Sequence, residues 1–431
     1  MTIPLRIGLA GLGTVGAGVA KILANQADVI GKRAGGSVVV TAVCARSKSK
    51  DRGVDLSAFE WFDDPVALAT SDAIDVFVEL VGGSEGPAND AVTAALKAGK
   101  HVVTANKALV ALHGATLAPL AEQAGVALNY EAAVAGGIPV IKAIREGLAG
   151  NEISRVSGIL NGTCNYILTE MEATGRAFDD VLADAQKLGY AEADPSFDVG
   201  GIDAAHKLAI LASLAFGVTL DFDGLYVEGI EAISAADIDF AKELGYKIRL
   251  LGIAARHGAG IEQRVHPVLV PVTSPLAAVT SVVNAVAIEG SAVGSVVLEG
   301  PGAGEGPTAS AVVGDIIDIA RGLVVAPFGI LSKDLQPSVT TPIAERVGSY
   351  YLRINATDRA GSMAEITKAL AEASVSIERI IQSSEPVDAG RLPVVIITHD
   401  TQEKAIENAL RLLNEHDDVL DQPMMIRVER D

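Results

Sequence analysis

The sequence predicts an α/β protein of three parts: a doubly wound, Rossmann-type parallel sheet at the N-terminus, an α+β domain in the middle and a ferredoxin-like unit at the C-terminus. Three observations lead to this expectation. Apolar strands alternate with helical segments through the first third of the chain, and this regular alternation is lost after about Val134. Residues 350–431 then follow the order strand, helix, strand, strand, helix, strand.

The first part begins with an apolar strand that runs directly into a glycine-rich turn. We expect its strands at Leu5–Ala10, Val38–Ala45, Ala73–Leu80, Lys100–Thr104 and Val126–Asn129. The polar, glycine-containing segment Asn25–Ser37 is expected to be a loop. Strands that alternate with helices at this pace form a parallel sheet with helices on both faces.

The middle part is expected to mix strands with helices. The expected strands are Glu152–Leu160 and Lys247–Ala255, and the expected helices are Phe178–Leu188 and Ile202–Phe216. The segment Gly300–Thr308 is rich in glycine and proline, and the helix expected after it, Ala309–Gly322, could return to the first domain.

The last part has the pattern of a split ferredoxin-like fold. Its strands are expected at Tyr350–Asn355, Ser376–Ser384, Pro393–His399 and Met424–Val428. Two helices between them are indicated by apolar side chains at helical spacing. These side chains are Met363, Ile366 and Leu370 in the first helix, and Ile406, Ala409, Leu410 and Leu413 in the second.

Composition limits the classes of function. The formal net charge of −20 argues against a nucleic-acid partner, because the phosphates would be repelled. Cys44 and Cys164 provide neither a disulfide framework nor the spacing of a metal site. No uncharged apolar run reaches the roughly 20 residues that a membrane span needs, and the glycine-rich turn comes too early for a signal peptide. We therefore expect a soluble, cytoplasmic protein.

The turn after the first strand reads Gly11-Leu12-Gly13-Thr14-Val15-Gly16 and opens an amphipathic helix. Gly11 would permit the tight turn, Gly13 would let the backbone approach a pyrophosphate, and Gly16 would allow close packing of helix on strand. The N–H groups at the start of the helix would bind the phosphates. This context favours a dinucleotide-binding turn over a purely structural one.

The end of the second strand bears on the choice of nucleotide. An Asp or Glu there would bind the ribose 2′-hydroxyl of NAD, but the sequence has Arg46, followed by Lys48, Lys50 and Arg52. In so acidic a chain, this local positive charge suits the 2′-phosphate of NADP. NADP is the expected cofactor and NAD the less favoured one. A solvated basic loop without a ligand is the alternative.

Two charged residues begin a helix whose continuation is apolar. Asp203 and Lys207 are four residues apart and would share one helix face, which continues as Ile210 and Leu214. An ion pair in the first turn of a helix, on the face that continues as buried apolar residues, would be shielded from water. Such a pair suits a site for an amine or hydroxyl substrate. An ordinary surface ion pair is the alternative.

A second lysine, Lys107, follows the strand expected to end at Thr104. The carboxyl ends of the strands face the ligand crevice in a doubly wound sheet, so Lys107 could reach a bound nicotinamide. Reduction of a carbonyl needs a hydride from the cofactor and a proton for the nascent alkoxide. A lysine can donate that proton or stabilise the negative charge.

Several long motifs together resemble homoserine dehydrogenase of the monofunctional bacterial type with a C-terminal ACT domain, over the whole chain. They are GLGTVG, VTANKAL, EAAVAGGIP, SGILNGTCNYIL, the stretch Gly189–Lys207 and GPGAGEGPTAS. The family reversibly reduces L-aspartate 4-semialdehyde to L-homoserine with NADPH or NADH, in threonine and methionine biosynthesis.

The resemblance also implies how the chain is divided. Residues 1–133 and about 306–340 would form the NAD(P)-binding domain, and residues 134–305 the substrate-binding, catalytic and dimerisation domain. Residues 348–431 would form the ACT regulatory domain. The expected assembly is a homodimer or a homotetramer.

By this resemblance, Lys207 would be the proton donor and Lys107 the second active-site lysine. Asp203 would act in catalysis and, with Glu192, in binding homoserine. Asp198 lies in the same acidic cluster, and the ammonium group of the substrate requires such carboxylates. Gly189 is expected to line the substrate site. The residues expected at the cofactor are Gly11, Gly13, Thr14, Val15, Gly16, Arg46, Lys48, Thr104, Lys107 and Gly304.

The stretch from Glu131 to Ile138 resembles the family's monovalent-cation loop. There the carboxylate of Glu131 and the carbonyl groups of Val134, Gly136 and Ile138 would hold sodium or a similar cation with a structural role. A glycine-containing loop without an ion is the alternative.

Residues 350–431 resemble an ACT domain, a module that typically pairs between subunits and binds an amino acid at the interface. Threonine, a downstream product of homoserine, would be the natural inhibitor, and a dimerisation module without a ligand is the alternative. The candidate regulatory positions are Asn355, Asp358, Gly361 and Gln382.

Two other functions fit parts of the sequence. The chain could be an NADP-dependent dehydrogenase of another amino-acid carbonyl, in which the acidic cluster binds a different substrate. It could also be a non-catalytic sensor that joins a nucleotide-binding domain to an amino-acid-binding domain. The sensor hypothesis leaves Lys107, Glu192, Asp203 and Lys207 without a role.

Overall fold

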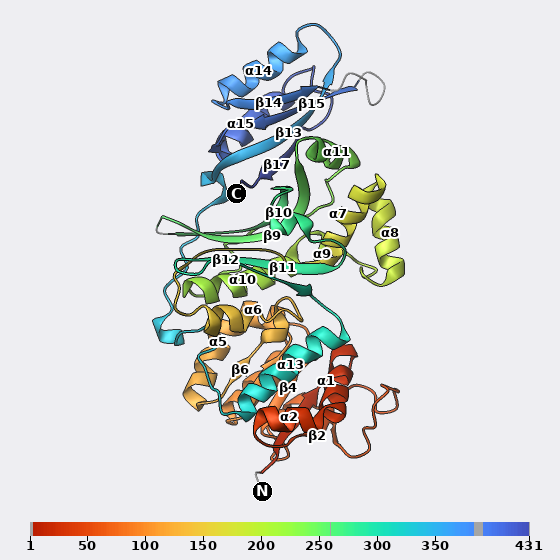
Figure 1. The fold of residues 1–431 in the computed structure, drawn as a ribbon, viewed down its shortest axis with the longest axis vertical. Coiled ribbons are helices and arrows are strands. Elements are labelled where there is room, and N and C mark those ends of the chain that lie inside the picture. Colours follow the sequence, from red (N-terminus) through yellow and green to blue (C-terminus); the bar gives the residue numbers. More distant parts are fainter. Residues whose placement is uncertain (1–2, 259, 383–390, 431) are drawn as a thin grey trace.

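The computed structural model describes residues 3–258, 260–382 and 391–430. Its three parts follow one another along the long axis of the molecule: the N-terminal parallel sheet, a middle domain and the C-terminal unit (Figure 1). The expected fold class is confirmed. Among the described residues, no helix is both long and apolar enough to span a membrane.

The N-terminal sheet has six parallel strands in the order β3-β2-β1-β4-β5-β6. They are β1 (Leu5–Ala10), β2 (Val38–Cys44), β3 (Glu60–Phe62), β4 (Val76–Glu79), β5 (His101–Thr104) and β6 (Leu128–Asn129). The strand order reverses between β1 and β4. At such a switch point, a doubly wound sheet opens a ligand crevice at the carboxyl ends of its strands.

Helices cover both faces of this sheet, and one of them comes from much later in the chain. They are α1 (Thr14–Asn25), α2 (Ala27–Ala34), α3 (Pro65–Ala69), α4 (Pro87–Lys97), α5 (Lys107–Ala124) and α13 (Glu305–Ala320). Val312 and Ile316 of α13 share a buried core with Val19 and Leu23 of α1. The late helix therefore lies beside α1 on the N-terminal sheet (Figure 1).

Two expectations about this part were wrong. The segment Asn25–Ser37 is not a loop but contains α2, which buries only Ile30 and Ala34 and ends at Gly35 with φ 76°. Two buried apolar residues are too few to give α2 a helical periodicity that the sequence would reveal. The helix expected at Ala309–Gly322 begins at Glu305. Its proline lies in the first turn, where backbone N–H groups have no partner within the helix.

The middle domain is built on an antiparallel sheet in the order β12-β11-β7-β9-β10. The strands are β7 (Ile153–Ile159), β8 (Tyr226–Val227), β9 (Tyr246–His257), β10 (Gly260–Pro271), β11 (Val283–Gly290) and β12 (Gly294–Pro301). The α-helices are α6 (Val140–Lys142), α7 (Gly162–Thr174), α8 (Phe178–Leu188), α9 (Ser196–Val199), α10 (Ile202–Phe216), α11 (Ala235–Glu243) and α12 (Pro275–Ala278). The bounds of α8 and α10 are those that the sequence predicts.

The helix α10 lies between this sheet and the N-terminal domain. Its apolar face, with Leu208 and Leu211, packs into the core that includes Val156 of β7 and Leu250 of β9. It also contacts α5 of the first domain. Its first turn is therefore held at the boundary between the two domains (Figure 1).

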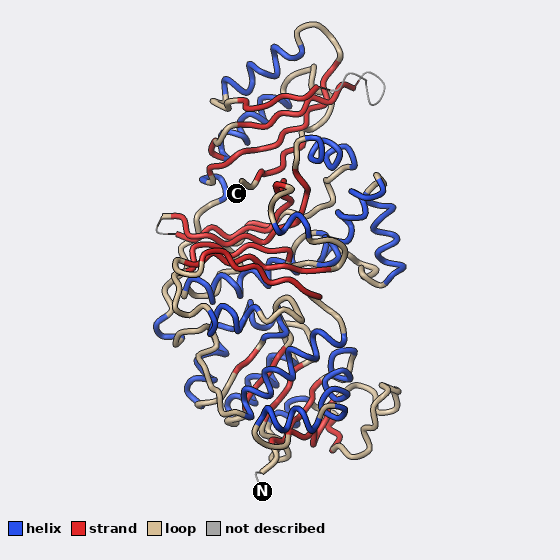
Figure 2. Tube along the Cα trace, viewed as in Figure 1, coloured by secondary structure: helices blue, strands red, loops and turns tan. Residues whose placement is uncertain are grey.

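The C-terminal unit has the strand order β17-β13-β15-β14 that a ferredoxin-like fold requires. Its elements are β13 (Val347–Thr357), α14 (Ser362–Glu372), β14 (Ile377–Gln382), β15 (Arg391–Thr398), β16 (Thr401–Gln402), α15 (Glu403–Asn414) and β17 (Met424–Val428). The last two residues of the strand expected at Ser376–Ser384 lie outside the described residues. β17 also pairs in parallel with β10, so the sheet continues into the middle domain (Figure 2).

Buried ion pairs accompany this joint between the middle domain and the C-terminal unit. Arg353 Nε of β13 lies 2.6 Å from Asp237, a buried residue in the first turn of α11. Glu429, directly after β17, lies 2.5 Å from Arg155 and 2.8 Å from Arg264. Burial would raise the pKa of Glu429, but these arginines outweigh burial and lower it to about 2.

Candidate active site

The glycine-rich turn lies at the switch point of the N-terminal sheet. Gly11 has φ 97°, and a Cβ atom there would overlap the carbonyl group of Leu80 after β4. A Cβ atom at Gly16 would overlap the carbonyl oxygen of Gly11. At Gly13, by contrast, nothing lies within 4 Å of the Cβ position. The turn is therefore tight on the protein side and open on the other, as close approach of a pyrophosphate requires.

A cavity of about 730 Å³ lies beside this turn, at the carboxyl ends of β1, β2 and β4. Arg46, Lys50 and Arg52 line it together with the glycines. Lys48 is not part of its lining, and its ammonium group lies 5.8 Å from the centre of the Trp61 ring. The volume and the positive charge of this cavity suit an anionic nucleotide.

A second cavity, of about 550 Å³, lies between the N-terminal and middle domains. The predicted site residues in its lining are Val15, Lys107, Gly136, Gly189, Asp198, Asp203, Lys207 and Gly304. Gly13 lines the first cavity and Val15 the second. A dinucleotide bound across the first turn of α1 would therefore reach both.

One carboxylate in this second cavity contacts both predicted lysines. Lys207 Nζ lies 2.7 Å from Asp203 Oδ2, and Lys107 Nζ lies 2.8 Å from Asp203 Oδ1. Lys207 Nζ also donates to the carbonyl oxygen of Leu160 at 2.7 Å. Asp203 is only 4% exposed. The sequence predicts the pairing of Asp203 with Lys207, and the fold adds Lys107 to it.

The electrostatics of this centre follow from the geometry. Burial would raise the pKa of Asp203, but the ammonium groups of Lys207 and Lys107 outweigh burial and hold it well below its usual range. The pKa of the neighbouring Asp198 is raised by burial, against a hydrogen bond from Asn161. Asp203 is therefore a fixed negative charge between two positive ones.

Of the residues expected to bind substrate or cofactor, five line neither cavity: Thr14, Gly16, Lys48, Thr104 and Glu192. The side chain of Glu192 is exposed and does not line the substrate cavity. Thr104 is buried, and its hydroxyl donates to Glu79 at 2.6 Å, behind the crevice. Thr14, the first residue of α1, is exposed and lines neither cavity.

Sequence reasoning missed several polar residues that line the substrate cavity, among them Asn161, Thr163 and Asn284. The hydroxyl of Thr163 donates to the carbonyl oxygen of Tyr190 at 2.7 Å. Asn161 caps α7, directly after β7, and an Asn between a strand and a helix is a signal that could have been followed. Asn284 carries no such local signal.

The loop from Glu131 to Ile138 offers oxygen atoms to a cation. Ala135 and Gly136 both have positive φ, 54° and 48°, which turns the chain back on itself. The buried carboxylate of Glu131 accepts the backbone N–H groups of Ile141 and Lys142, both at 2.9 Å. Burial, followed by the neighbouring Asp315, raises the pKa of Glu131 to about 7.

These features fit a small cation, because the one lysine that acts on the buried carboxylate, Lys142, is itself paired with Asp315 and Asp318. Val134 and Ile138, whose carbonyl groups are the other expected ligands, are both buried within the same turn. Within the described part of the chain, no group of three or more His, Cys, Asp or Glu side chains could hold a metal ion. Any ion here would therefore depend mainly on backbone oxygens.

The four candidate regulatory residues lie around one end of the C-terminal unit. Asn355 Nδ2 donates to Asp421 at 3.1 Å, and Gly361 has φ 103° before α14. Asp358 and Gln382 are exposed. None of the four lines either cavity of the active site.

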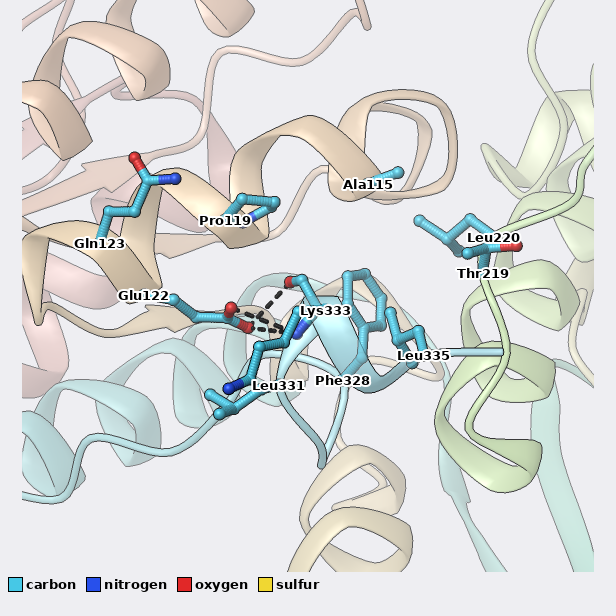
Figure 3. A pocket seen from close by; sticks show the side chains of 11 residues that line it. Ala115, Pro119, Glu122, Gln123, Thr219, Leu220, Phe328, Leu331, Lys333 and Leu335 are labelled. Carbon is cyan, nitrogen blue, oxygen red and sulfur yellow. Dashed lines mark hydrogen bonds between the residues drawn. The ribbon is translucent and has the colours of Figure 1, made fainter. Parts of the chain in front are cut away.

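A third cavity, of about 540 Å³, lies beside α5 and has a different character (Figure 3). Phe328, Leu331 and Leu335 line it, and Glu122 on α5 accepts a hydrogen bond from the hydroxyl of Ser332 at 2.8 Å. None of the residues expected to bind a cofactor or substrate lines it. It is not part of the active site.

The second cavity brings together the two requirements of hydride transfer: access to a nicotinamide over α1 and a lysine able to donate a proton. Fold and site together define a dinucleotide-dependent dehydrogenase. Three family models match the chain: "Homoserine dehydrogenase, NAD binding domain" at residues 11–131, "Homoserine dehydrogenase" at residues 139–317, and "ACT domain" at residues 350–416. The chain belongs to the homoserine dehydrogenase family.

Individual relatives agree over the full length. The homoserine dehydrogenase of Neisseria gonorrhoeae is 47% identical over 433 residues, and that of Pseudomonas aeruginosa is 46% identical over 435 residues, each covering 99% of both chains. The crystal structure of a homoserine dehydrogenase from Thiobacillus denitrificans matches with a TM-score of 0.93 at 44% identity, covering 99% of this chain and 98% of that one.

The family resemblance expected from the motifs is thus confirmed. The chain is an oxidoreductase with an NAD(P)-binding domain, homoserine dehydrogenase activity and a C-terminal ACT domain. A dehydrogenase of another amino-acid carbonyl and a non-catalytic sensor are set aside.

Proposed function

We propose that this enzyme reduces L-aspartate 4-semialdehyde with NADPH in preference to NADH, and that Lys207 supplies the proton. The observation that carries this proposal is the position of Asp203 between Lys207 and Lys107 in the cavity beside α1. When bound, the reduced nicotinamide supplies the hydride that reaches the aldehyde carbon.

The contacts of Lys207 leave it one N–H group for the substrate. An ammonium group has three donors. Two of those on Lys207 are used by Asp203 and by the carbonyl oxygen of Leu160. The third would donate to the aldehyde oxygen and pass its proton to the alkoxide as that oxygen becomes negative.

Lys107 and Asp203 set the charge around that oxygen. Both ammonium groups lie in the cavity beside Asp203, and their positive charge would stabilise a developing alkoxide. Lys107 also lies 5.6 Å from the centre of the Phe197 ring, a contact that helps to fix its side chain. Asp203 thereby orients both lysines and takes part in catalysis through them.

Carboxylates at the edge of the cavity would bind the ammonium group of the substrate. Asp198 lines the cavity, and one of its oxygens accepts a hydrogen bond from Asn161. The other oxygen is available to a cationic ligand. Glu192 remains a second proposed ligand, although its side chain is exposed here. The backbone of Gly189 lines the same cavity.

The preference for NADP rests on Arg46 and its neighbours at the end of β2. Arg46, Lys50 and Arg52 line the cavity beside the glycine-rich turn. A hyperthermophilic archaeal homoserine dehydrogenase in complex with NADPH shares this fold, with a TM-score of 0.65 and 28% identity over 74% of this chain. That complex supports the cofactor class, and the positive charge of Arg46, Lys50 and Arg52 supports binding of the 2′-phosphate.

A monovalent cation is the second proposed ligand. Glu131, with the carbonyl groups of Val134, Gly136 and Ile138, would hold sodium or a similar ion between the domains. Its role would be structural, because the loop packs against Gly302 next to the active site. Thermal midpoints measured in sodium chloride and in choline chloride at equal ionic strength test this, with a higher midpoint expected in sodium.

The division of the chain is proposed as residues 1–133 with about 306–340, residues 134–305, and residues 348–431. The cores that α13 shares with α1 and that α10 shares with the middle sheet support this division. We further propose a cytoplasmic homodimer or homotetramer whose ACT domains bind threonine through Asn355, Asp358, Gly361 and Gln382. An ACT domain is consistent with such feedback control.

Initial rates of homoserine oxidation with NADP and with NAD, each with and without threonine, test these proposals together. We expect turnover with both cofactors, a lower KM with NADP, and inhibition by threonine. Equal kcat/KM values for NADP and NAD would show that Arg46, Lys50 and Arg52 do not select the cofactor. Unchanged rates at saturating threonine would show that threonine is not the effector of this enzyme.

A further inference from the structure

Asn161 lies in the turn between β7 and α7 and contacts both carboxylates of the active site. Its Nδ2 atom donates to Asp198 Oδ1 and to Asp203 Oδ2, both at 2.8 Å. Its Oδ1 atom accepts the backbone N–H of Cys164 at 2.8 Å and so caps α7. The side chain is buried, with 4% of its surface exposed. Because each end of the amide has its own partners, its orientation is fixed.

We propose that Asn161 is a positioning residue for the reaction: its amide holds Asp203 between the two lysines and directs Asp198 at the substrate cavity. Two carboxylates held this close would repel each other, and a neutral group with two N–H donors can bind both. A serine or threonine has one donor, and an ionised aspartate has none. The contacts therefore call for an amide of this length.

The backbone of the same turn fixes the other member of the ion pair. The carbonyl oxygen of Leu160 accepts a hydrogen bond from Lys207 Nζ at 2.7 Å, while the next side chain binds Asp203. A Cβ atom at Gly162 would lie 2.7 Å from the carbonyl oxygen of Val282, so the residue directly before β11 closely confines the turn. The turn thus has little room to shift if the amide contacts are lost.

The substitution Asn161→Asp separates the positioning role from the capping role. Aspartate caps a helix as well as asparagine does, so α7 should stay intact. It replaces two donors by acceptors and places a third carboxylate against Asp198 and Asp203. We expect kcat to fall about 100-fold, because small displacements of catalytic groups have effects of this size. NADP affinity should be unchanged, since Asn161 lies outside the basic cavity.

The pH profile supplies a readout that a purely structural role would not move. Burial and the carboxylates of Asp198 and Asp203 favour protonation of the introduced side chain and Lys207 and Lys107 oppose it, a balance that at Asp198 raises the pKa. The protonated side chain then regains one donor. The deficit in kcat relative to the unsubstituted enzyme should therefore be larger at pH 9 than at pH 6. Asn151→Asp is the matched control in the same domain, since its side chain binds only the backbone of Leu148, Ala292 and Val293. It should keep the unsubstituted kcat at both pH values.

The outcomes are distinct. An unchanged kcat for Asn161→Asp across this pH range would overturn the proposal, as would a lowered thermal midpoint with full kcat in the folded fraction. If Asn161→Asp does not fold, Asn161→Ser keeps a cap and offers one donor, and unchanged kcat in that variant would overturn the proposal equally. The kcat of Lys207→Ala is measured alongside. If Lys207→Ala retains turnover, the assignment of the active site fails. If Lys207→Ala is inactive while Asn161→Asp has the kcat of the unsubstituted enzyme, only the role of Asn161 is overturned.

Discussion

Lys107 Nζ lies 2.8 Å from Asp203 Oδ1. Lys107 begins α5 of the N-terminal domain, and Asp203 lies in the first turn of α10 of the middle domain. The ion pair therefore spans the two domains at the cavity that both of them line. Because the same carboxylate also contacts Lys207, the geometry of the proton-transfer centre depends on how the domains are held together.

The first prediction concerns this interdomain contact. Lys107→Ala should lower kcat about 100-fold, because it removes one of the two positive charges beside the developing alkoxide. Binding of NADP, measured by protein fluorescence or calorimetry, should change less than threefold. Lys21→Ala is the control, since Lys21 pairs with Glu305 at 2.7 Å on the surface of the same domain. A normal kcat in Lys107→Ala would contradict the role given to the interdomain pair.

The second prediction compares the two carboxylates proposed to bind the ammonium group of the substrate. Asp198→Asn should raise the KM for homoserine at least tenfold, because the cavity loses a negative charge that faces the ligand. Glu192→Gln should raise it less, since the Glu192 side chain is exposed in the structure. Steady-state kinetics at saturating NADP measure both. A larger effect in Glu192→Gln would show that Glu192, and not Asp198, is the principal ligand.

The third prediction concerns cofactor choice. Arg46→Asp should shift the ratio of kcat/KM for NADP over NAD at least tenfold towards NAD, because an aspartate repels a 2′-phosphate and can accept from a ribose hydroxyl. Arg52 is less suitable for this test, since it donates to the carbonyl oxygen of Leu12 at 3.0 Å and supports the glycine-rich turn. Lys48→Asp is the control and should act weakly, because Lys48 lies over Trp61. An unaltered ratio in Arg46→Asp contradicts the assignment.

The fourth prediction concerns acid stability at the joint with the C-terminal unit. The pKa of Glu429 is lowered from 4.5 to about 2, mainly by Arg264 and Arg155 against the effect of burial. Its contribution to stability is therefore complete above pH 4.5 and is lost as the pH falls towards 2. From the shift, the contribution is about 3 kcal/mol.

Glu429→Gln should accordingly lower the free energy of unfolding at pH 7, and the difference from the unsubstituted protein should shrink below pH 4. Glu415→Gln is the control, because its pair with Arg411 is exposed on both sides. Denaturant titrations at pH 7 and pH 3 measure the difference. A deficit in Glu429→Gln that is equal at both pH values would disprove the ionic origin of the effect.

The sequence predicts the elements whose patterns are strong and local. The bounds of β1, α8, α10 and β17 coincide with the expected ones, because each has clear periodicity or a sharp boundary. β10 was not expected, since it carries Arg264 and His266, which are normally surface residues. Both are buried here, and Arg264 is compensated by Glu262 of the same strand and by Glu429, which follows β17 at the other end of the chain. Such compensation becomes visible only after folding.

The residues of the candidate site likewise fall into those that local sequence patterns predict and those that only the fold brings together. Asp203 and Lys207 could be paired from the sequence because they share a helix face, and Lys107 could be placed from the topology of a parallel sheet. Asn161 could not be placed, because its two partners are 37 and 42 residues away in the chain. The exposed position of Glu192 could not be foreseen either, since α8 and α9 meet in an irregular segment. Local patterns give candidate groups, and tertiary contacts decide which of them act together.

The most direct test of Lys207 as the proton donor is the kcat of Lys207→Ala for homoserine oxidation at saturating homoserine and NADP, with NADP binding measured on the same preparation. We expect a loss of at least 1000-fold, on the order expected for a catalytic proton donor placed in a charged site, with NADP affinity retained. A kcat within tenfold of the unsubstituted enzyme would contradict this role of Lys207, because the proton would then come from another group.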